Sequence, residues 1–292
     1  MRRRRVQIGK TVRMQKQPTT AARLAAAAKS ILPNWLHAPA RAAWRKVYAV
    51  CAEWPEVKLY LQLAWNRLTG RSYLRWYADT LDGWVESRDP EFLARKRAAL
   101  AESGAEDLAV LKGFGLLPSS TLHEYGCGQL RSALHFVEYL DPGNFSANDA
   151  SKGRIDLGLE LFGSRINPRR PTFIVNADNS FDWLNGRKFD FLWCHAVFGH
   201  MPAADVEDTF ANLHKAMHAK SAFFFTFDEP RLQIPDAKDE IVRIDARNWL
   251  QSIAFFDRIA RKYGLVAEDV SGAIRPYESF RKHMCLARVT KA

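Results

Sequence analysis

The chain has 292 residues and 47% hydrophobic content, which is enough for one α/β domain with a sizeable core and an appendage. Its net charge of +11 is confined to the beginning: 12 of the 43 Lys and Arg residues lie in 1–52, a stretch without acids, so 31 bases and 32 acids remain elsewhere. A body of balanced charge argues against a nucleic-acid enzyme, and no apolar run reaches the roughly 18 residues of a membrane span.

Cysteine usage indicates a reducing compartment. Cys51, Cys127, Cys194 and Cys285 are dispersed, and none forms a C-x-x-C pair of the kind that binds zinc. We therefore expect free thiols and a cytoplasmic protein. The acid-poor, Arg- and Ala-rich beginning also resembles an organelle transit peptide, which stays open as an alternative.

The first 115 residues divide into an arm and a cap. Residues 1–20 are basic and polar without a sustained period, which predicts a disordered arm, either a solvated tail or a contact to an anionic membrane surface or another polyanion. Residues 21–115 predict a helical cap that holds six of the nine tryptophans. A cap docked on the main domain is favoured over an amphipathic helix lying on a membrane.

The last part of this cap, residues 89–115, predicts two helices. Asp89-Pro90 is a good helix start, Ser103-Gly104 predicts a break, and a second short helix ends at Gly113 or Gly115. The catalytic domain then extends over 116–292.

A glycine-rich turn, Leu122-His-Glu-Tyr-Gly-Cys-Gly128, is the centre of that domain. It predicts a strand, a turn, a helix over 131–139 and a second strand over 145–149, the repeating unit of a parallel sheet. Gly126 and Gly128 let a ligand approach the backbone. Asp149, about 20 residues further on, suits the hydroxyls of a ribose.

Such a turn can bind a dinucleotide or S-adenosylmethionine. An ordinary turn that binds no ligand is the third interpretation. A dinucleotide fingerprint requires a third glycine, but Arg131 stands there. Glu124, two residues before the first glycine, is a poor neighbour for a pyrophosphate and tolerates the ammonium or sulfonium of S-adenosylmethionine. S-adenosylmethionine is therefore favoured over NAD.

The remaining elements alternate as in a doubly wound sheet. The pattern predicts strands and helices in this order: helix 151–162, strand 172–176, strand 189–193, helix 205–219, strand 222–227, helix 248–263, and an antiparallel pair formed by 266–270 and 283–289.

This order and its motifs resemble the class I S-adenosylmethionine-dependent methyltransferases over roughly residues 100–292. The segments that carry the resemblance are E-x-G-x-G at 124–128, the acid Asp149, Phe189-Asp-Phe-Leu-Trp-Cys-His-Ala-Val-Phe-Gly-His-Met-Pro202, and Ala211 to Met217 followed by Ser221 to Phe227. The usual P-G-G turn before the fifth strand is replaced by His218-Ala-Lys-Ser221. The turn and the segment after the fourth strand look most like bacterial methyltransferases of uncertain substrate.

The resemblance implies an α/β, Rossmann-like, doubly wound seven-stranded sheet with an N-terminal helical cap, and S-adenosylmethionine as cofactor. Gly126, Cys127 and Gly128 would border the methionine moiety, with Glu124 holding its amino group. Asp149 would bind the ribose, Asp178 and the Asn179 backbone the adenine, and the backbone at Cys194 or His195 the methionine side.

Methyl transfer needs alignment and, for a hydroxyl acceptor, a base, but no metal. His195 and His200 follow the fourth predicted strand. Because histidine is the residue type that ordinarily titrates near neutrality, either suits that role, although a structural histidine is the plainer interpretation of each. Asp228 and Glu229 are secondary candidates. The D/N-P-P-Y motif of amino-group methylation is absent, since the position reads Cys194-His-Ala-Val.

Three functions remain open. The first is methyl transfer to a hydroxyl or amine of a small-molecule or glycan-type acceptor, which we favour. The second is a nucleic-acid methyltransferase that uses the basic arm, and the third is a non-catalytic partner protein of the same fold. The acceptor and the oligomeric state are not readable from the sequence.

Overall fold

The computed structural model describes residues 61–82 with gaps at 63, 67 and 71, and residues 89–229, 240–243 and 248–292. The expected basic arm and the expected cap up to residue 60 lie outside the described residues. Within these ranges, no helix has both the length and the apolar composition to cross a membrane.

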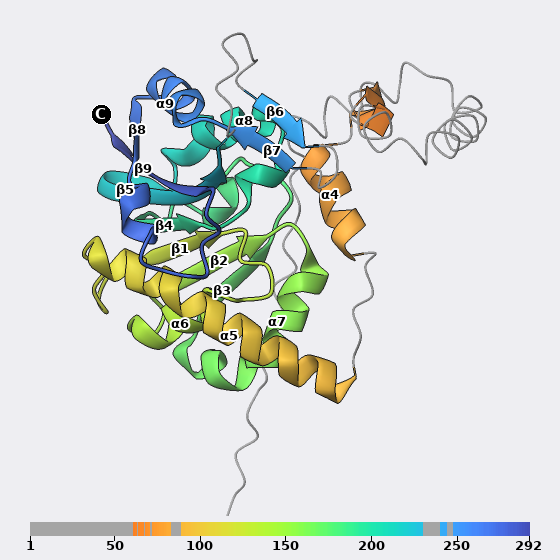
Figure 1. The fold of residues 1–292 in the computed structure, drawn as a ribbon, viewed down its shortest axis with the longest axis vertical. Helices are drawn as coiled ribbons and strands as arrows, with labels where there is room; N and C mark the ends of the chain where they lie inside the picture. Colours follow the sequence, from red (N-terminus) through yellow and green to blue (C-terminus); the bar gives the residue numbers. More distant parts are fainter. Residues whose placement is uncertain are drawn as a thin grey trace, which may run out of the picture.

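Seven strands form one sheet in the order β3-β2-β1-β4-β5-β9-β8 (Figure 1). Neighbouring strands are parallel, except that β9 runs antiparallel to both β5 and β8. The strands are β1 (Leu122–Tyr125), β2 (Phe145–Asp149), β3 (Thr172–Val175), β4 (Phe189–Cys194), β5 (Met217–Asp228), β8 (Leu265–Asp269) and β9 (Met284–Lys291). The order reverses between β1 and β4, where open α/β sheets bind their ligands.

Helices cover both faces of this sheet (Figure 1). One face packs against α5, α6 and α7, and the other packs against α8 and α9. These helices are α5 (Pro90–Gly113), α6 (Ala133–Tyr139), α7 (Lys152–Ile166), α8 (Ala203–Leu213) and α9 (Ile253–Lys262).

The interior strand β5 shows why both faces are covered. Phe223, Phe225 and Phe227 belong to the core on the α8–α9 side, whereas Phe224 belongs to the core on the α5–α7 side. All four side chains are at most 2% exposed. Because successive side chains of a strand point to opposite faces, such a continuous aromatic run requires two buried faces.

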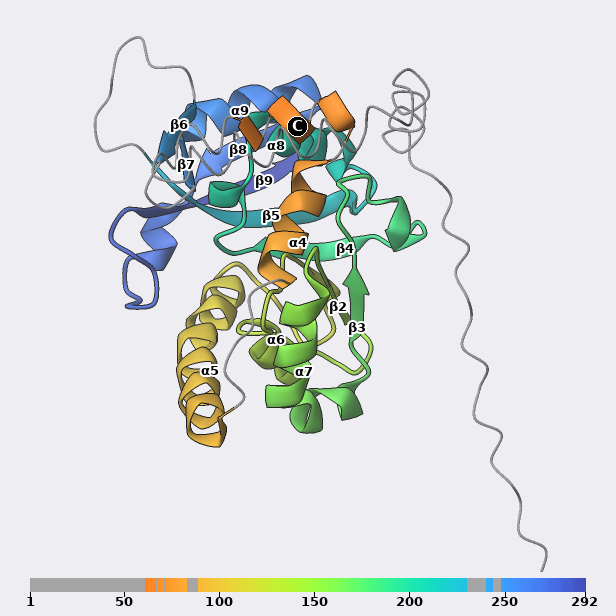
Figure 2. The ribbon, with the colours of Figure 1, turned by 90° about the vertical axis from the view of Figure 1, so that its right-hand side faces the viewer.

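Two further elements lie at the end of the sheet. A two-stranded hairpin consists of β6 (Glu240–Arg243) and β7 (Asn248–Gln251), and the beginning of α4 (Tyr73–Asp82) lies against it (Figure 1). Figure 2 shows that the other end of α4 lies beside α7. The ring of Tyr73 packs edge-on against Trp249 of β7 at 5.5 Å. Gln251 is buried and donates to the carbonyl of Met201 at 3.4 Å, which ties the hairpin to the segment after β4.

The doubly wound sheet and the closing antiparallel pair are confirmed, but the break at Ser103-Gly104 is wrong. Helix α5 runs without interruption from Pro90 to Gly113. Gly104 serves close packing instead, since a Cβ atom there would lie 2.0 Å from the carbonyl oxygen of Arg131.

Two further boundaries differ from the expectation. The helix expected over 205–219 ends at Leu213, because Met217 already pairs with Phe189 at the beginning of β5. The helix expected over 248–263 begins only at Ile253, because residues 248–251 pair with β6 and Ser252 caps the helix by accepting from the amide of Phe255. At both boundaries, residues that fit the helical periodicity belong instead to paired strands.

Candidate functional site

A cavity of about 270 Å³ lies at the carboxyl ends of β1, β2 and β4, where the strand order reverses. Its floor comes from the glycine-rich turn and the residues that end β2. Its wall comes from the segment after β4, and α4 contributes Leu74, Tyr77 and Leu81 as an apolar roof. Predicted site residues in the cavity wall are Glu124, Gly126, Cys127, Gly128, Asp149, His195 and His200.

The glycine turn has a backbone that other residues adopt only with strain. Gly126 has φ of 80° and Gly128 has φ of 52°. A Cβ atom at Gly126 would lie 2.4 Å from a methyl of Val197, and one at Gly128 would lie 2.9 Å from the guanidinium of Arg154. Both glycines are therefore required by the turn itself and by the close approach of the two neighbouring segments.

Asp149 fixes this turn from the end of β2. One carboxylate oxygen accepts from the amide of Gly128 at 2.8 Å, and the other accepts from the amide of Ser151 at 2.8 Å. Burial raises the pKa of Asp149, while these amides and Arg154 oppose the rise. A carboxylate has about four acceptor positions, so two remain for hydroxyl groups of a ligand in the cavity.

Glu124 is a carboxyl group of the cavity wall that is both buried and incompletely hydrogen-bonded. Its side chain is almost completely buried, and Oε2 has no hydrogen-bond partner among the described residues. Burial, together with the negative charge of Asp107, raises the pKa of Glu124 to about 8. A buried acceptor without a partner is costly, so a cationic or hydrogen-bond-donating ligand would stabilise it.

The two histidines lie in different surroundings. Nδ1 of His195 is 3.4 Å from Oδ1 of Asp107 on α5, and the ring packs against Phe280 at 5.2 Å. The ring of His200 stacks on Tyr77 of the roof at 5.7 Å with an interplanar angle of 22°. The structure therefore brings both candidates into the cavity wall, with His195 beside a carboxylate and His200 beneath α4.

Three predicted residues lie outside the cavity wall. Cys194 is buried in the core on the α8–α9 side. The carboxylate of Asp178 accepts from the amide of Ser180 at 3.0 Å, and the amide side chain of Asn179 accepts from the Tyr125 hydroxyl at 2.5 Å. Asp178 and Asn179 nevertheless follow Asn176, which does line the cavity. The cofactor contacts expected of these three residues stay predictions.

Several polar residues of the site were missed by the sequence analysis. Arg154 lines the cavity from the first turn of α7, and its Nε is buried without a hydrogen-bond partner among the described residues. Its only signal was its place three residues after Ser151, at the helix that follows Asp149. Asp82 at the end of α4 accepts from the amide of Gly153 at 3.0 Å, which joins the roof to the same turn.

Comparison with solved structures identifies the fold. The glycopeptide N-methyltransferase MtfA matches with a TM-score of 0.50 and 13% identity, over 72% of this chain and 100% of that chain. MtfA complexed with S-adenosylmethionine matches with a TM-score of 0.50 and 12% identity, over 65% of this chain and 94% of that chain. A TehB-like S-adenosylmethionine-dependent methyltransferase from Corynebacterium glutamicum ATCC 13032 Kitasato has a TM-score of 0.49 and 20% identity, over 69% of this chain and 97% of that chain.

The two MtfA matches show that the chain has the fold of class I S-adenosylmethionine-dependent methyltransferases, as the resemblance predicted. No protein-family model matches it, and no curated protein matches it either.

Proposed function

We propose that this protein is an S-adenosylmethionine-dependent methyltransferase that moves a methyl group to a hydroxyl or amine of a small-molecule or glycan-type acceptor. The observation that carries the proposal is the buried Oε2 of Glu124, an acceptor without a partner in the wall of the cavity. This oxygen lies near the carboxyl ends of the strands, where a methyltransferase fold binds its cofactor.

The residues of the cavity fit this cofactor in charge. S-adenosylmethionine carries an ammonium and a sulfonium, which suit Glu124, and ribose hydroxyls, which suit Asp149. The buried Nε of Arg154 offers a donor beside these acceptors. NAD fits less well, because its pyrophosphate would place two negative charges near these two carboxyl groups.

Each residue has a part in the reaction. S-adenosylmethionine supplies an electrophilic methyl group, whose transfer to a hydroxyl breaks the S–CH₃ bond, forms an O–CH₃ bond, leaves the electron pair on sulfur and releases the hydroxyl proton. The glycine turn and Asp149 hold and orient the cofactor, and the apolar roof of α4 excludes water. Either His195 or His200, both of which line the cavity, would accept the proton from a hydroxyl acceptor.

Calorimetric titration with S-adenosylmethionine at pH 8.5 tests the assignment. We expect the wild type to bind and Glu124→Gln to bind about 10- to 100-fold more weakly, because a charge-assisted hydrogen bond is worth about 1.5–3 kcal/mol. Glu138→Gln is the matched control, since Glu138 pairs with Arg165 on the surface away from the cavity. If Glu124→Gln bound S-adenosylmethionine as tightly as the control Glu138→Gln, Glu124 would have no role in binding the cofactor.

The acceptor class needs a second experiment. Methyl-labelled S-adenosylmethionine is incubated with hydroxyl- and amine-bearing small molecules, with glycans and with oligonucleotides. We expect label in the first two sets. Label in the oligonucleotides alone would favour a nucleic-acid methyltransferase, and no transfer to any set by a protein that binds the cofactor would favour a non-catalytic partner.

A further inference from the structure

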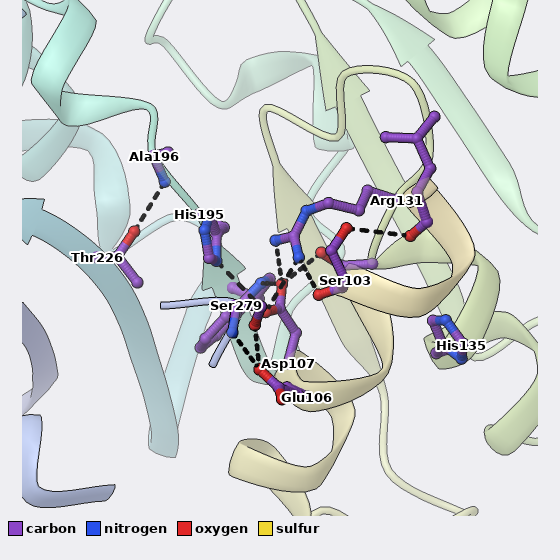
Figure 3. A network of polar contacts seen from close by, with 12 residues as sticks. Ser103, Glu106, Asp107, Arg131, His135, His195, Ala196, Thr226 and Ser279 are labelled. Atoms are coloured by element: carbon purple, nitrogen blue, oxygen red, sulfur yellow. Dashed lines mark hydrogen bonds and ion pairs between the residues drawn. The ribbon is translucent and has the colours of Figure 1, made fainter. Parts of the chain in front are cut away.

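Asp107 of α5 is a buried carboxylate at the centre of a polar cluster that adjoins the cavity (Figure 3). One oxygen accepts from Arg131 at 2.6 Å and from the indole N–H of Trp193 at 3.1 Å, and also from the hydroxyl of Ser132. The other oxygen lies 3.4 Å from Nδ1 of His195. Asp107 therefore links a helix that precedes the sheet to the histidine that follows β4.

This placement depends on close packing of α5 against the turn after β1. Gly104 allows the contact, because any Cβ atom there would meet the carbonyl of Arg131 at 2.0 Å. The guanidinium of Arg131 reaches back and donates to the carbonyl of Ser103 at 2.6 Å. Ser103 and Gly104, where the sequence predicted a helix break, therefore make the contacts that bring Asp107 beneath the cavity.

The His195 ring is held from two other directions. The next residue, Ala196, has φ of 54°, which is strained for a residue with a Cβ atom, and its amide donates to the hydroxyl of Thr226 at 2.8 Å. Phe280 packs on the ring at 5.2 Å. Glu106, the neighbour of Asp107, accepts from the amide of Ser279 at 2.8 Å and so holds the loop that carries Phe280.

The contacts distinguish the two ring nitrogens. Nδ1 is buried and makes no hydrogen bond to a described residue, but it faces Oδ1 of Asp107 at 3.4 Å. A carboxylate accepts hydrogen bonds and cannot donate one, so Asp107 is the acceptor toward which an Nδ1 proton would point. Burial alone would raise the pKa of Asp107, but the charges of protonated His195 and of Arg131 lower it to about 2. The ion pair with Arg131 persists when the His195 ring is neutral, so the carboxylate stays ionised at neutral pH.

We propose that Asp107 is a positioning residue that keeps the proton of neutral His195 on Nδ1, so that Nε2 is the basic nitrogen for the acceptor. This inference rests on the proposed function. In the reaction the acceptor O–H bond breaks, its proton goes to Nε2, and the electron pair on oxygen forms the bond to the methyl carbon. Asp107 stabilises the resulting imidazolium and stays ionised.

Three further charged groups interact with Asp107. They are Glu106 on α5, Glu124 on β1 and Arg131 in the turn after β1, whereas Asp228 at the end of β5 and Arg281 before β9 are occupied with one another. Asp228 and Arg281 form an ion pair with each other, and Arg131 pairs with Asp107 itself. Asp107 is therefore the carboxylate in direct contact with the ring among the described residues.

Nitrogen-15 NMR of the histidine rings tests the proposal on the free full-length protein. His195 is assigned by the signal lost in His195→Gln. We expect Nδ1 of His195 to carry the proton in the neutral ring and Nε2 to be unprotonated. A wild-type His195 with its proton on Nε2 would overturn the proposal, and this result needs no folded Asp107 variant.

A variant pair then measures the coupling. Asp107→Asn should lower the pKa of His195 by about one unit or more, because an opposite charge at this distance favours the charged ring. Asp190→Asn is the matched control, since Asp190 pairs with His218 at 3.0 Å and should move that histidine alone. A folded Asp107→Asn with unchanged His195 pKa contradicts the proposal. No cofactor or acceptor is present, so failure here is separate from failure to bind S-adenosylmethionine.

Discussion

The two sides of the cavity differ in how the chain builds them. On the side proposed for the cofactor, the glycine turn and Asp149 come from one continuous stretch, 122–149, and hold each other through the amide of Gly128. The side proposed for the acceptor joins α4 and the segment after β4, which are far apart in sequence. The β7 strand packs behind α4 through Trp249, and Phe280 packs behind His195. We therefore expect substitutions on the cofactor side to affect cofactor affinity strongly and those on the acceptor side to affect it weakly.

The largest effect is expected at the glycine turn. Gly126→Ala should weaken S-adenosylmethionine binding by about 100-fold, because the backbone strain of about 1–3 kcal/mol adds to the contact with Val197. Calorimetry on a variant whose circular dichroism matches the wild type measures this. Gly113→Ala is the control, since a Cβ atom there meets nothing within 4 Å. Wild-type affinity in Gly126→Ala would refute the close-approach argument.

A pH effect of moderate size is expected from Glu124. Its pKa of about 8 in the free protein means that the carboxyl is mainly protonated at pH 7. A cationic ligand binds the ionised form, so affinity should rise as pH increases and level off above pH 8, with a roughly tenfold weaker binding at pH 7 than at pH 8.5. Binding at pH 7 should release a proton, visible in buffers of different ionisation enthalpy.

Glu124→Gln provides the comparison for this pH profile. The variant cannot ionise, so its affinity should change little over the same interval. A variant profile as steep as that of the wild type would assign the pH effect to another group.

The smallest effect on cofactor affinity is expected on the acceptor side. Tyr77→Ala removes the ring that stacks on His200 and should weaken S-adenosylmethionine binding by less than about threefold, because the roof contacts are apolar and few. Tyr77→Phe, which keeps the stack, is the matched control. A loss as large as that of Gly126→Ala would show that α4 belongs to the cofactor site and would break the division between the two sides.

The same division explains what could be predicted from the sequence. The glycine turn and Asp149 follow from spacing within a single strand-turn-helix-strand unit, because their geometry is local. Asp107 could not be predicted, since its role depends on the packing of α5 against Arg131, and Gly104 gave the opposite signal of a helix break. The start of α9 was also wrong, because the pairing of 248–251 with β6 is a contact that helical periodicity does not contain.

The residues predicted to contact the adenine are an intermediate case. Spacing after the third strand predicts Asp178 and Asn179, and both follow β3 as expected. The structure gives their side chains contacts within the loop and to Tyr125, while Asn176 reaches the cavity wall. The sequence therefore identifies the segment, but the direction of each side chain depends on loop geometry.

Thermal unfolding with S-adenosylmethionine, S-adenosylhomocysteine and NAD tests the central claim most directly. At about 100 times its dissociation constant, a cofactor should stabilise the wild type by about 2.7 kcal/mol. We expect this shift with the first two ligands and not with NAD, its loss in Asp149→Ala, and its retention in the control Asp156→Ala, whose carboxylate pairs with Lys152 on the surface. A folded, ligand-free wild type that shows no shift with S-adenosylmethionine, or an equal shift with NAD, would contradict the account.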